Sequence, residues 1–597
     1  MTQSSPELGV DGDWYRLTLR DGAPVAWLDD REGRHWAELR LLASADALDG
    51  PDETLGVEGP EVSETGGATR LTWTLRSSRW TSKRLILEAR PDVLAVHAEI
   101  EGAGRLTDVR LLCGRTVRAT GSGLLMSGAW FQTLFSPAPA HPLKIARRAS
   151  EGATIGVVSG SEPGFGSWFF TPAPLCFAAT REPALRGTEL PAGPWLWFGL
   201  EAALGDATFP SFDYEAIDRG FGFHVPYEAK EVVDGTWRTP VLVIGEATDP
   251  YAAIAAHGRR LIQAGLARPE PHTDEPPGWW REPIFCGWGA QSRLALADGL
   301  GMRGAPGYST QANYDSFLSH LERHGIVPGT IIIDDKWQAA YGTCRPDGRN
   351  WPDLRGWIAR RHAAGQRVLL WWKAWDAEGV PAEWCVRSET GEPLGLDPTH
   401  PDAAAAIADA VRTMLAPEGL DADGLKIDFT ARTPSGVATR HHGKAWGIAL
   451  LHELLVLVAR EARRVKPDTL LVGHTANPWF GAHVDMIRLN DMIRLDDPEP
   501  RVDVVPQMRY RAAVVRAALP EHLIDTDDWC PPDLETWRRY LAIKAELGVP
   551  ALYYATGLDL SGEDFEPEDY AAIRRVWATY RAANGLAARG GSTPAAL

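Results

Sequence analysis

An aspartate and a lysine two residues apart are the groups in this sequence best suited to catalysis. In segment 425–429 (LKIDF), Asp428 follows an apolar run and Lys426 lies two residues earlier, on the same face of an extended strand. A nearby ammonium keeps a carboxylate ionised and nucleophilic. Cleavage of a glycosidic bond needs two carboxyl groups: one attacks C1 or activates water, and the other protonates the leaving oxygen. Asp428 is the candidate for the first role.

Similar residues end other short apolar segments of the chain. A single aspartate in such a place is commonly the cap of a following helix. A buried mouth with many charges, however, costs several kcal/mol unless a ligand or mutual pairing compensates them. Acidic, basic or imidazole groups end six segments: Asp334 and Asp335, Lys373, Lys426 and Asp428, His474, Arg488 and Asp491, and Asp525 and Asp527.

The elements that must position these groups begin after Trp279. Short apolar strands alternate there with helix-length amphipathic segments, which is typical of parallel strands with helical crossovers. We expect eight strands, at 283–288, 330–335, 367–373, 423–429, 469–474, 486–491, 522–527 and 549–555. Eight strand-helix pairs close a (β/α)8 TIM barrel, whose catalytic groups gather at the C-terminal ends of the strands.

A different pattern precedes the barrel. From Trp14 to about Thr248, short runs alternate polar and apolar residues between Gly, Pro and Asp, which predicts a large antiparallel β-sandwich. Segment 251–265 has helical spacing and ends in glycine, and a Pro-rich linker follows it. The expected fold class is therefore α/β and β, with an N-terminal β-sandwich (1–248), a linker helix and Pro-rich linker (249–278) and a catalytic barrel (279–597).

Bulk composition narrows the classes of partner and compartment. The formal charge of -18 over 597 residues argues against a nucleic-acid partner, because phosphate binding draws on clustered Lys and Arg. No signal peptide or membrane-spanning run occurs, so we expect a soluble, cytoplasmic protein. The six cysteines lack CxxC spacing, which favours reduced, buried thiols. The 25 tryptophans suit core packing and stacking on sugar rings, so position must decide between these roles.

At these residues the sequence resembles the clan of α-galactosidases and raffinose synthases, especially glycoside hydrolase family 36. IIIDDKWQ (331–338) resembles the family's DDGWQ-type segment, LKIDF its KxD nucleophile motif, and GLDPTHPDA (395–403) the segment ahead of the helix that leads to that strand. The resemblance implies that Asp428 is the nucleophile and that Asp334, Asp335 and Lys426 bind the substrate. Trp288 and Trp372, at the ends of strands one and three, become expected walls of the sugar pocket, with Arg488, Lys373 and His474 as further substrate-binding residues.

Three departures from the family pattern affect the interpretation. Lys336 replaces a small residue and Lys373 lies near where many relatives have an acidic one, which suggests either an acidic sugar or two solvated lysines. The family's C-terminal β-domain is expected to be missing. Its strand-six Arg and following Asp occur here in tandem hexads, MIRLND (486–491) and MIRLDD (492–497). Only one hexad can be the strand, so Asp491 is the expected acid/base and Asp497 the alternate.

The resulting expectation is a retaining α-glycosidase, most closely of α-galactosidase type, acting on a small carbohydrate without metal or organic cofactor. A raffinose-synthase-type transglycosylase shares the same residues, and an α-glycosidase for another, acidic sugar is a further alternative. A carbohydrate-binding protein on a degenerate barrel is disfavoured because both carboxylates are present. Metal-dependent hydrolysis through Asp334, Asp335 and Asp525 is disfavoured because His474 is the only histidine at a strand end. The sugar, the linkage and any homo-oligomer are left open.

Overall fold

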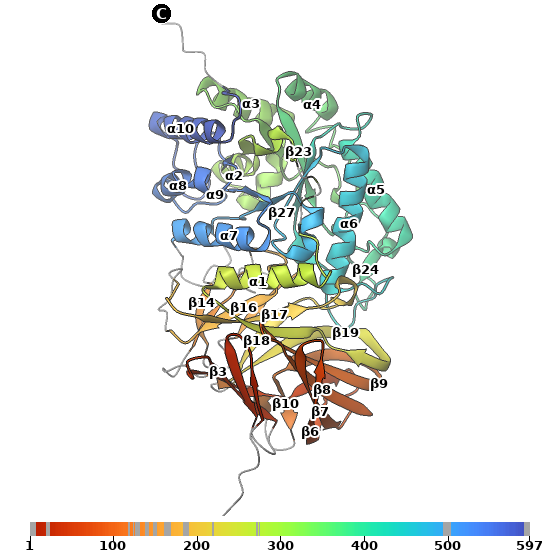
Figure 1. The fold of residues 1–597 in the computed structure, drawn as a ribbon. Helices are drawn as coiled ribbons and strands as arrows, with labels where there is room; N and C mark the ends of the chain where they lie inside the picture. The colour runs from red at the N-terminus through yellow and green to blue at the C-terminus, as the bar shows by residue number, and fades with distance from the viewer. Residues whose placement is uncertain are drawn as a thin grey trace, which may run out of the picture.

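The protein consists of a β-sandwich stacked on a (β/α)8 barrel, as expected (Figure 1). The structure, a computed structural model, describes residues 8–589 apart from 20–23, 117–119, 123, 126–131, 138–141, 147–151, 160–168, 183–189, 218–219, 270, 272, 274 and 494–502. Among these described residues, no helix combines the length and apolar character needed to span a membrane. The six cysteines are all buried and free, as the sequence predicts.

Two sheets form the N-terminal sandwich, antiparallel except where β10 runs parallel to β6. The smaller has the order β1-β2-β3-β4-β12 and the larger is built around the long strands β9 and β19. The smaller sheet comprises β1 (Leu8–Asp11), β2 (Tyr15–Leu19), β3 (Val25–Asp30), β4 (His35–Arg40) and β12 (Leu124–Leu125). The larger comprises β5 (Ala43–Ala47), β6 (Glu53–Thr65), β7 (Ala68–Ser77), β8 (Ser82–Ala89), β9 (Leu94–Leu111), β10 (Cys113–Thr116), β11 (Thr120–Ser122), β13 (Gln132–Phe135), β14 (Leu143–Ala146), β15 (Ala153–Ile155), β16 (Cys176–Thr180), β17 (Trp195–Glu201), β18 (Phe212–Ile217), β19 (Gly220–Arg238) and β20 (Val241–Ala247).

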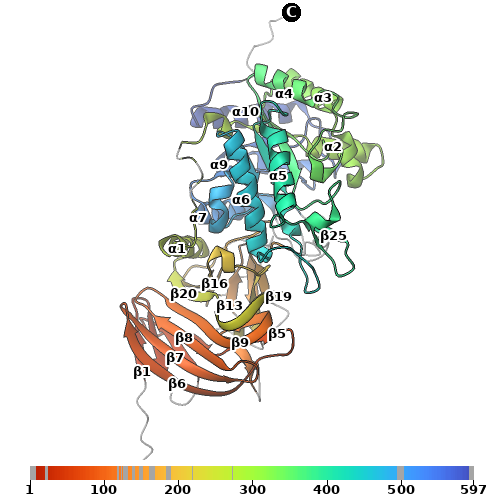
Figure 2. The ribbon, with the colours of Figure 1, turned by 90° about the vertical axis from the view of Figure 1, so that its right-hand side faces the viewer.

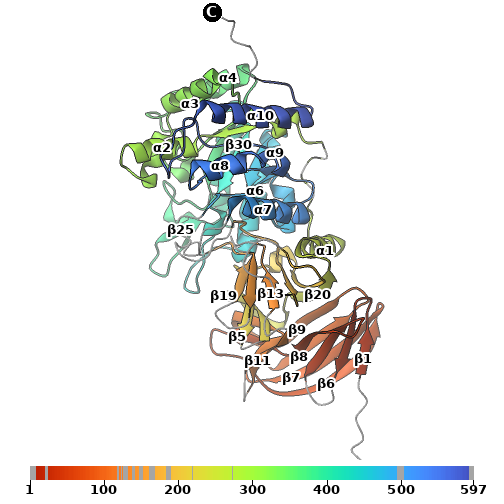
Figure 3. The same ribbon diagram turned by 90° about the vertical axis from the view of Figure 1, so that its left-hand side faces the viewer.

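Helix α1 (Pro250–Gln263) lies between the two layers in all three views (Figures 1, 2 and 3). It begins where the side chain of Asp249 accepts hydrogen bonds from the amides of Tyr251 and Ala252, with Pro250 in the first turn. Its apolar face packs on β16, β17 and β20 of the sandwich and on α7 of the barrel. The expected linker helix is thus present, while the exact domain boundaries stay predictions.

All eight expected barrel strands are present. They are β21 (Ile284–Cys286), β22 (Thr330–Ile333), β23 (Arg367–Lys373), β26 (Gly424–Asp428), β27 (Leu470–Gly473), β28 (Met486–Arg488), β29 (Leu523–Asp525) and β30 (Ala551–Leu552), paired in parallel in chain order, with β30 beside β21. The short hairpin β24 (Cys385–Arg387) and β25 (Pro393–Leu396) stands outside the barrel. The surrounding helices are α2 (Trp288–Ala297), α3 (Gln311–Arg323), α4 (Leu354–Ala363), α5 (Pro401–Leu415), α6 (Gly447–Val465), α7 (Val504–Ala518), α8 (Leu534–Leu541), α9 (Lys544–Leu547) and α10 (Pro567–Ala583). Figure 2 faces α5 and α6, and Figure 3 faces α7 to α10.

The ring closes between β29 and β30 through a short stretch of backbone pairing, in which the amide of Val549 donates to Ile524 (2.7 Å) and that of Thr526 to Val549 (3.2 Å), and through side chains. A single bridge joins Asp525 to Val549. Thr526 adds a hydrogen bond from its hydroxyl to the carbonyl of Val549 (3.0 Å), and the fully buried Lys544 pairs with Asp528 (2.9 Å). The carboxylate of Asp528 also accepts the amide of Tyr553 (2.8 Å) at the end of β30. We call this joint the β29–β30 seam.

Strand register decides which side chains face the barrel interior. In the β23–β26 pair, Trp371 lies opposite Lys426 and Lys373 lies opposite Asp428. In the β28–β29 pair, Arg488 lies opposite Asp525. Because successive side chains on a strand point to opposite faces, these residues share the inner face and their immediate neighbours point outward.

Candidate active site

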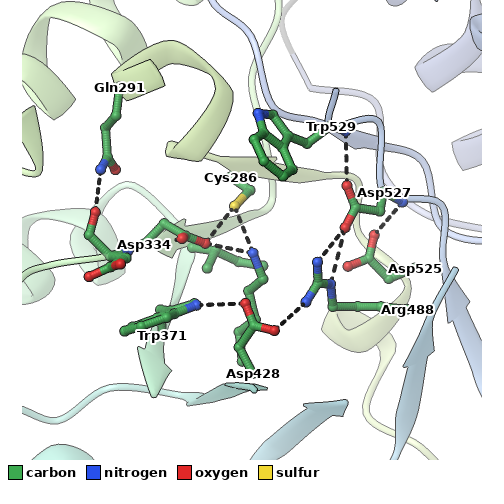
Figure 4. A network of polar contacts seen from close by, with 12 residues as sticks. Cys286, Gln291, Asp334, Trp371, Asp428, Arg488, Asp525, Asp527 and Trp529 are labelled. Atoms are coloured by element: carbon green, nitrogen blue, oxygen red, sulfur yellow. Dashed lines mark hydrogen bonds and ion pairs between the residues drawn. The ribbon is translucent and has the colours of Figure 1, made fainter. Parts of the chain in front are cut away.

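Asp428 is the last residue of β26 and lies at the centre of a polar network (Figure 4). Its Oδ2 accepts a hydrogen bond from the indole N–H of Trp371 (3.1 Å), and its Oδ1 accepts the amide of Phe429 (2.9 Å). The guanidinium of Arg488 approaches Oδ1 to 3.4 Å. These contacts fix the carboxylate at the C-terminal mouth of the barrel, where the sequence predicts a nucleophile.

The charges around Asp428 keep it ionised. Burial acts to raise its pKa, but the positive charges of Arg488 and Lys426, together with His474 and the Trp371 hydrogen bond, lower the pKa well below its usual range. A carboxylate that stays deprotonated throughout the neutral range can act as a nucleophile without first losing a proton.

Asp334 and Lys426 form a buried ion pair beside this carboxylate. Lys426 Nζ lies 2.6 Å from Asp334 Oδ2, and the two side chains are only 2% and 3% exposed. The thiol of Cys286, at the end of β21, donates to the same oxygen at 3.0 Å. Burial raises the pKa of this thiol, so it remains a neutral donor. No sequence motif points to Cys286; its position at the end of strand one is the signal that could have identified it.

Asp335 has a different environment from its neighbour. Its Oδ1 accepts the phenol O–H of Tyr341 (2.7 Å), and its backbone carbonyl accepts the side-chain amide of Gln291. Burial, together with the charge of Asp334, raises the pKa of Asp335 to about 7, against the hydrogen bond from Tyr341. The paired aspartates therefore differ in environment: Asp334 is bound to a lysine, and Asp335 is able to hold a proton near neutrality.

The first of the tandem hexads forms strand six. β28 spans Met486–Arg488, so Asp491 follows the strand at the mouth, whereas Asp497 lies outside the described residues. The Arg488 guanidinium lies 3.4 Å from Asp428 and 3.8 Å from Asp491. One side chain thus links the two carboxylates that the sequence assigned to nucleophile and acid/base.

Arg488 is itself held by strand seven. The Nε and Nη2 of Arg488 donate hydrogen bonds to Asp527 Oδ2 (3.1 and 2.6 Å), and Asp527 is fully buried. Asp525, also fully buried, accepts the amide of Asp527 (3.0 Å), and burial plus the charge of Asp527 raise the pKa of Asp525 to about 7. Sequence reasoning noted both aspartates as strand-end groups but did not identify Asp527 as the partner of Arg488.

The metal hypothesis receives no support from the geometry of these carboxylates. Within the part of the chain that the structure describes, no three His, Cys, Asp or Glu side chains converge as metal ligands would. Asp334, which that hypothesis required, is instead paired with Lys426.

One of the two tryptophans predicted to line the sugar pocket does not face the barrel interior. Trp372 pairs in register with Ile427 on the outer face of β23, where it is buried among apolar side chains. Trp371, one residue earlier, shares the inner face with Lys373 and contacts Asp428. The prediction of Trp372 is wrong because it ignored the alternation of faces: the expected strand 367–373 already ends at Lys373, and with Lys373 on the inner face Trp372 must point outward and Trp371 inward.

Trp288 lies at the rim and not on a strand. It is the first residue of α2, and its ring packs edge-on against that of Trp529, with centroids 5.8 Å apart. The Trp529 indole donates to Asp559 (2.8 Å), which fixes its orientation (Figure 4 labels Trp529). Trp288 therefore lies near the mouth, but at the start of a helix and beside a second tryptophan.

The two unexpected lysines are compensated by neighbouring carboxylates. Lys336 pairs with Glu378 (2.7 Å) and Lys373 with Asp376 (2.5 Å). Both ammonium groups also lie over the ring of Tyr341, at 4.1 and 4.0 Å from its centroid. The lysines thus contact the ring of Tyr341, whose hydroxyl donates to Asp335. Because carboxylates pair with them, they leave little uncompensated positive charge for an acidic sugar.

His474 follows β27 and contacts the sandwich as well as the barrel. Its Nε2 lies 2.8 Å from the hydroxyl of Thr430, which in turn lies 2.6 Å from the hydroxyl of Thr171. The predicted role of His474 in substrate binding stays a prediction. Its ring contacts Thr430, in the segment that follows Asp428, and Thr171 of the N-terminal domain contacts both Thr430 and the backbone carbonyl of His474.

Solved structures of other proteins share this architecture. No family model and no curated protein matches the sequence. Among solved structures, the α-galactosidase from Lactobacillus brevis aligns over 98% of this chain and 84% of its own at 12% identity (TM-score 0.50). A family 31 sulfoquinovosidase from E. rectale aligns over 96% and 82% at 12% identity (TM-score 0.54), and a family 36 α-galactosidase from Geobacillus stearothermophilus over 97% and 86% at 12% identity (TM-score 0.51). The chain therefore has the fold of these glycosidases.

Proposed function

We propose that this protein is a retaining α-glycosidase that removes a terminal α-linked sugar through a glycosyl-enzyme on Asp428, with α-galactosides as the first substrates to test. The observation that carries the proposal is the ionised carboxylate of Asp428, joined through Arg488 to a second carboxyl group, Asp491. The shared guanidinium brings both carboxyl groups to the same mouth, and a retaining mechanism requires them to lie about 5 to 5.5 Å apart. The fold, which is also that of α-galactosidases, supports the same reaction class.

The reaction proceeds in two displacements. In the first, an oxygen of Asp428 bonds to the anomeric carbon while the bond from that carbon to the leaving oxygen breaks, and the Asp491 carboxyl group gives its proton to that oxygen. In the second, the Asp491 carboxylate takes a proton from water, whose oxygen attacks the anomeric carbon and releases Asp428. A sugar hydroxyl in place of water would give transglycosylation by the same residues.

The remaining groups bind the innermost sugar. Asp334 and Asp335 accept hydrogen bonds from its hydroxyl groups, and Lys426 donates one. The half-buried Trp288–Trp529 pair offers apolar surface to a face of the ring. The compensated charges of Lys336 and Lys373 favour a neutral sugar over an acidic one.

Chemical rescue tests the nucleophile directly. A screen of p-nitrophenyl α- and β-glycosides, including uronides, first identifies the sugar. Asp428→Gly should then abolish turnover, and added azide should restore release of p-nitrophenol and yield a glycosyl azide of inverted configuration. Absence of glycosyl azide from a variant whose parent is active would mean that Asp428 is not the nucleophile.

A further inference from the structure

A fully buried arginine holds the turn that carries Asp491. Arg511, on α7, is 0% exposed. Its Nη1 donates to three successive backbone carbonyls, those of Leu489 (2.8 Å), Asn490 (3.1 Å) and Asp491 (2.7 Å). The same guanidinium contacts the side-chain oxygen of Gln507 through Nη2. These carbonyls belong to the residues that lead from the end of β28 to the candidate acid/base.

Burial of the Arg511 guanidinium costs folding free energy, so a stabilising role alone does not explain it. Among the described residues, no carboxylate forms an ion pair with Arg511, and burial lowers its pKa to about 9. An apolar side chain of similar volume is often as stabilising as a buried charge, or more so. The free-energy cost of burying this guanidinium is therefore better explained by the turn that it holds in place. In that turn Asn490 adopts the left-handed region (φ 66°).

The other face of this guanidinium is covered by the N-terminal domain. The carbon of the Arg511 guanidinium lies 3.1 Å from the ring centroid of Phe169, a 0% exposed residue of the sandwich. The carbonyl of Phe169 accepts the side-chain amide of Asn490 (3.1 Å). Phe169 thus contacts both the arginine and the turn that the arginine holds.

The neighbouring residues of the sandwich continue this contact along the mouth. The amide of Thr171 donates to the carbonyl of His474 (3.0 Å), and the carbonyl of Ala173 accepts the side chain of Asn477 (2.9 Å). Segment 169–173 of the first domain therefore runs along the ends of strands five and six of the second domain, on the side of Asp428 that carries Asp491.

We propose that Arg511 and Phe169 are positioning residues for the acid/base: together they hold the turn 489–491 so that the Asp491 carboxyl group meets the leaving oxygen. The inference rests on the proposed function, and it makes the β-sandwich a part of the catalytic unit. It concerns proton donation alone, because neither residue contacts Asp428 in the structure.

Leaving-group dependence separates this role from a merely structural one. With the sugar identified by the screen, a dinitrophenyl glycoside needs little protonation and an alkyl glycoside needs much. A general acid contributes about 10² to 10⁴ in rate. Arg511→Gln should therefore reduce kcat/KM at least about 30-fold more for the alkyl than for the dinitrophenyl glycoside, and Arg511→Lys should recover part of the loss. Phe169→Leu, which keeps the apolar volume, should change the same ratio in the same direction by a smaller factor.

A buried arginine at the opposite end of the barrel provides the matched control. Arg581 on α10 is 4% exposed and donates to Glu282 (3.0 Å) and to the carbonyl of Val327 (2.8 Å), both of which precede barrel strands. Arg581→Gln should lower stability without changing the leaving-group ratio.

Two outcomes overturn the inference while leaving the proposed function intact. Either the two glycosides lose rate equally in Arg511→Gln and Phe169→Leu, or Arg581→Gln gives the same ratio as they do. Labelling of Asp428 by a 2-deoxy-2-fluoroglycosyl fluoride, whose leaving group needs no acid, should be retained in every variant. If Arg511→Gln fails to fold, Phe169→Leu decides alone. A wild-type protein that cleaves no glycoside and is not labelled refutes the proposed function itself.

Discussion

Removal of the lysine from the Asp334–Lys426 pair should separate stability from activity. In Lys426→Met the carboxylate of Asp334, 2% exposed, keeps as donors, among the described residues, only the Cys286 thiol and the amide of Asp335. Breaking a buried pair by removing one partner costs about 3 to 5 kcal/mol, because an uncompensated charge remains in the interior. We expect the free energy of unfolding to fall by about that amount.

The double variant Asp334→Asn/Lys426→Met should recover most of this loss, since a neutral pair replaces the stranded charge. Activity should not recover, because both groups proposed to bind the sugar are still altered. Urea unfolding monitored by tryptophan fluorescence gives the stability, and kcat/KM on the best aryl glycoside gives the activity.

Lys373→Met is the matched control for this experiment. Its pair with Asp376 is 17% and 18% exposed, so its loss should cost at most about 1 kcal/mol. A cost below about 1 kcal/mol for Lys426→Met, or a double variant no more stable than the single one, would refute the reasoning. Either result would mean that water or another group already compensates Asp334.

Three further predictions concern single residues of the site. Trp371→Phe should lower kcat/KM about tenfold through loss of one hydrogen bond to Asp428, whereas Trp372→Phe should leave it within about twofold; equal effects would contradict the strand parity. The raised pKa of Asp335, about 7, implies stability that is fully present below the ordinary pKa of 3.8 and lost as pH rises through 7. Asp335→Asn should therefore gain stability relative to wild type between pH 4.5 and pH 8 in urea titrations, and a pH-independent difference would disprove the assignment. Asp491→Asn should slow alkyl glycosides far more than activated aryl glycosides; that signature in Asp497→Asn instead would move the acid/base to the second hexad.

The barrel could be predicted from the sequence because its signals are local. Each strand is a short apolar run next to a helical one, and residues at the strand ends, such as Asp428 and Asp334, follow from where that run stops. The KxD spacing also placed Lys426 on the inner face, since side chains of a strand alternate. The predicted proximity of Asp491 to Asp428 agrees with the contacts that Arg488 makes to both, whereas their catalytic roles stay predictions.

The contacts between distant segments could not be predicted in this way. Phe169 lies in an aperiodic loop more than 300 residues from Asn490, so no pattern links them. Arg511 reads as an ordinary residue of an amphipathic helix, and only the fold shows that its side chain points inward. The partner of Arg488 posed the same difficulty, because Asp525, Asp527 and Asp528 are all close to the end of one strand and only the register assigns a role to each.

The β29–β30 seam has a consequence for how the barrel moves. The barrel should open first where the fewest backbone pairs join neighbouring strands. Between β29 and β30 there is a single bridge, Asp525 to Val549. Amides of these two strands should therefore exchange with solvent through smaller fluctuations than those of the central strands β23 and β26. Asp527, which holds Arg488, lies two residues past this bridge, so each transient opening would also loosen the arginine that spans both carboxylates. The lifetime of the closed barrel then sets how long Asp428 and Asp491, the proposed catalytic pair, stay aligned.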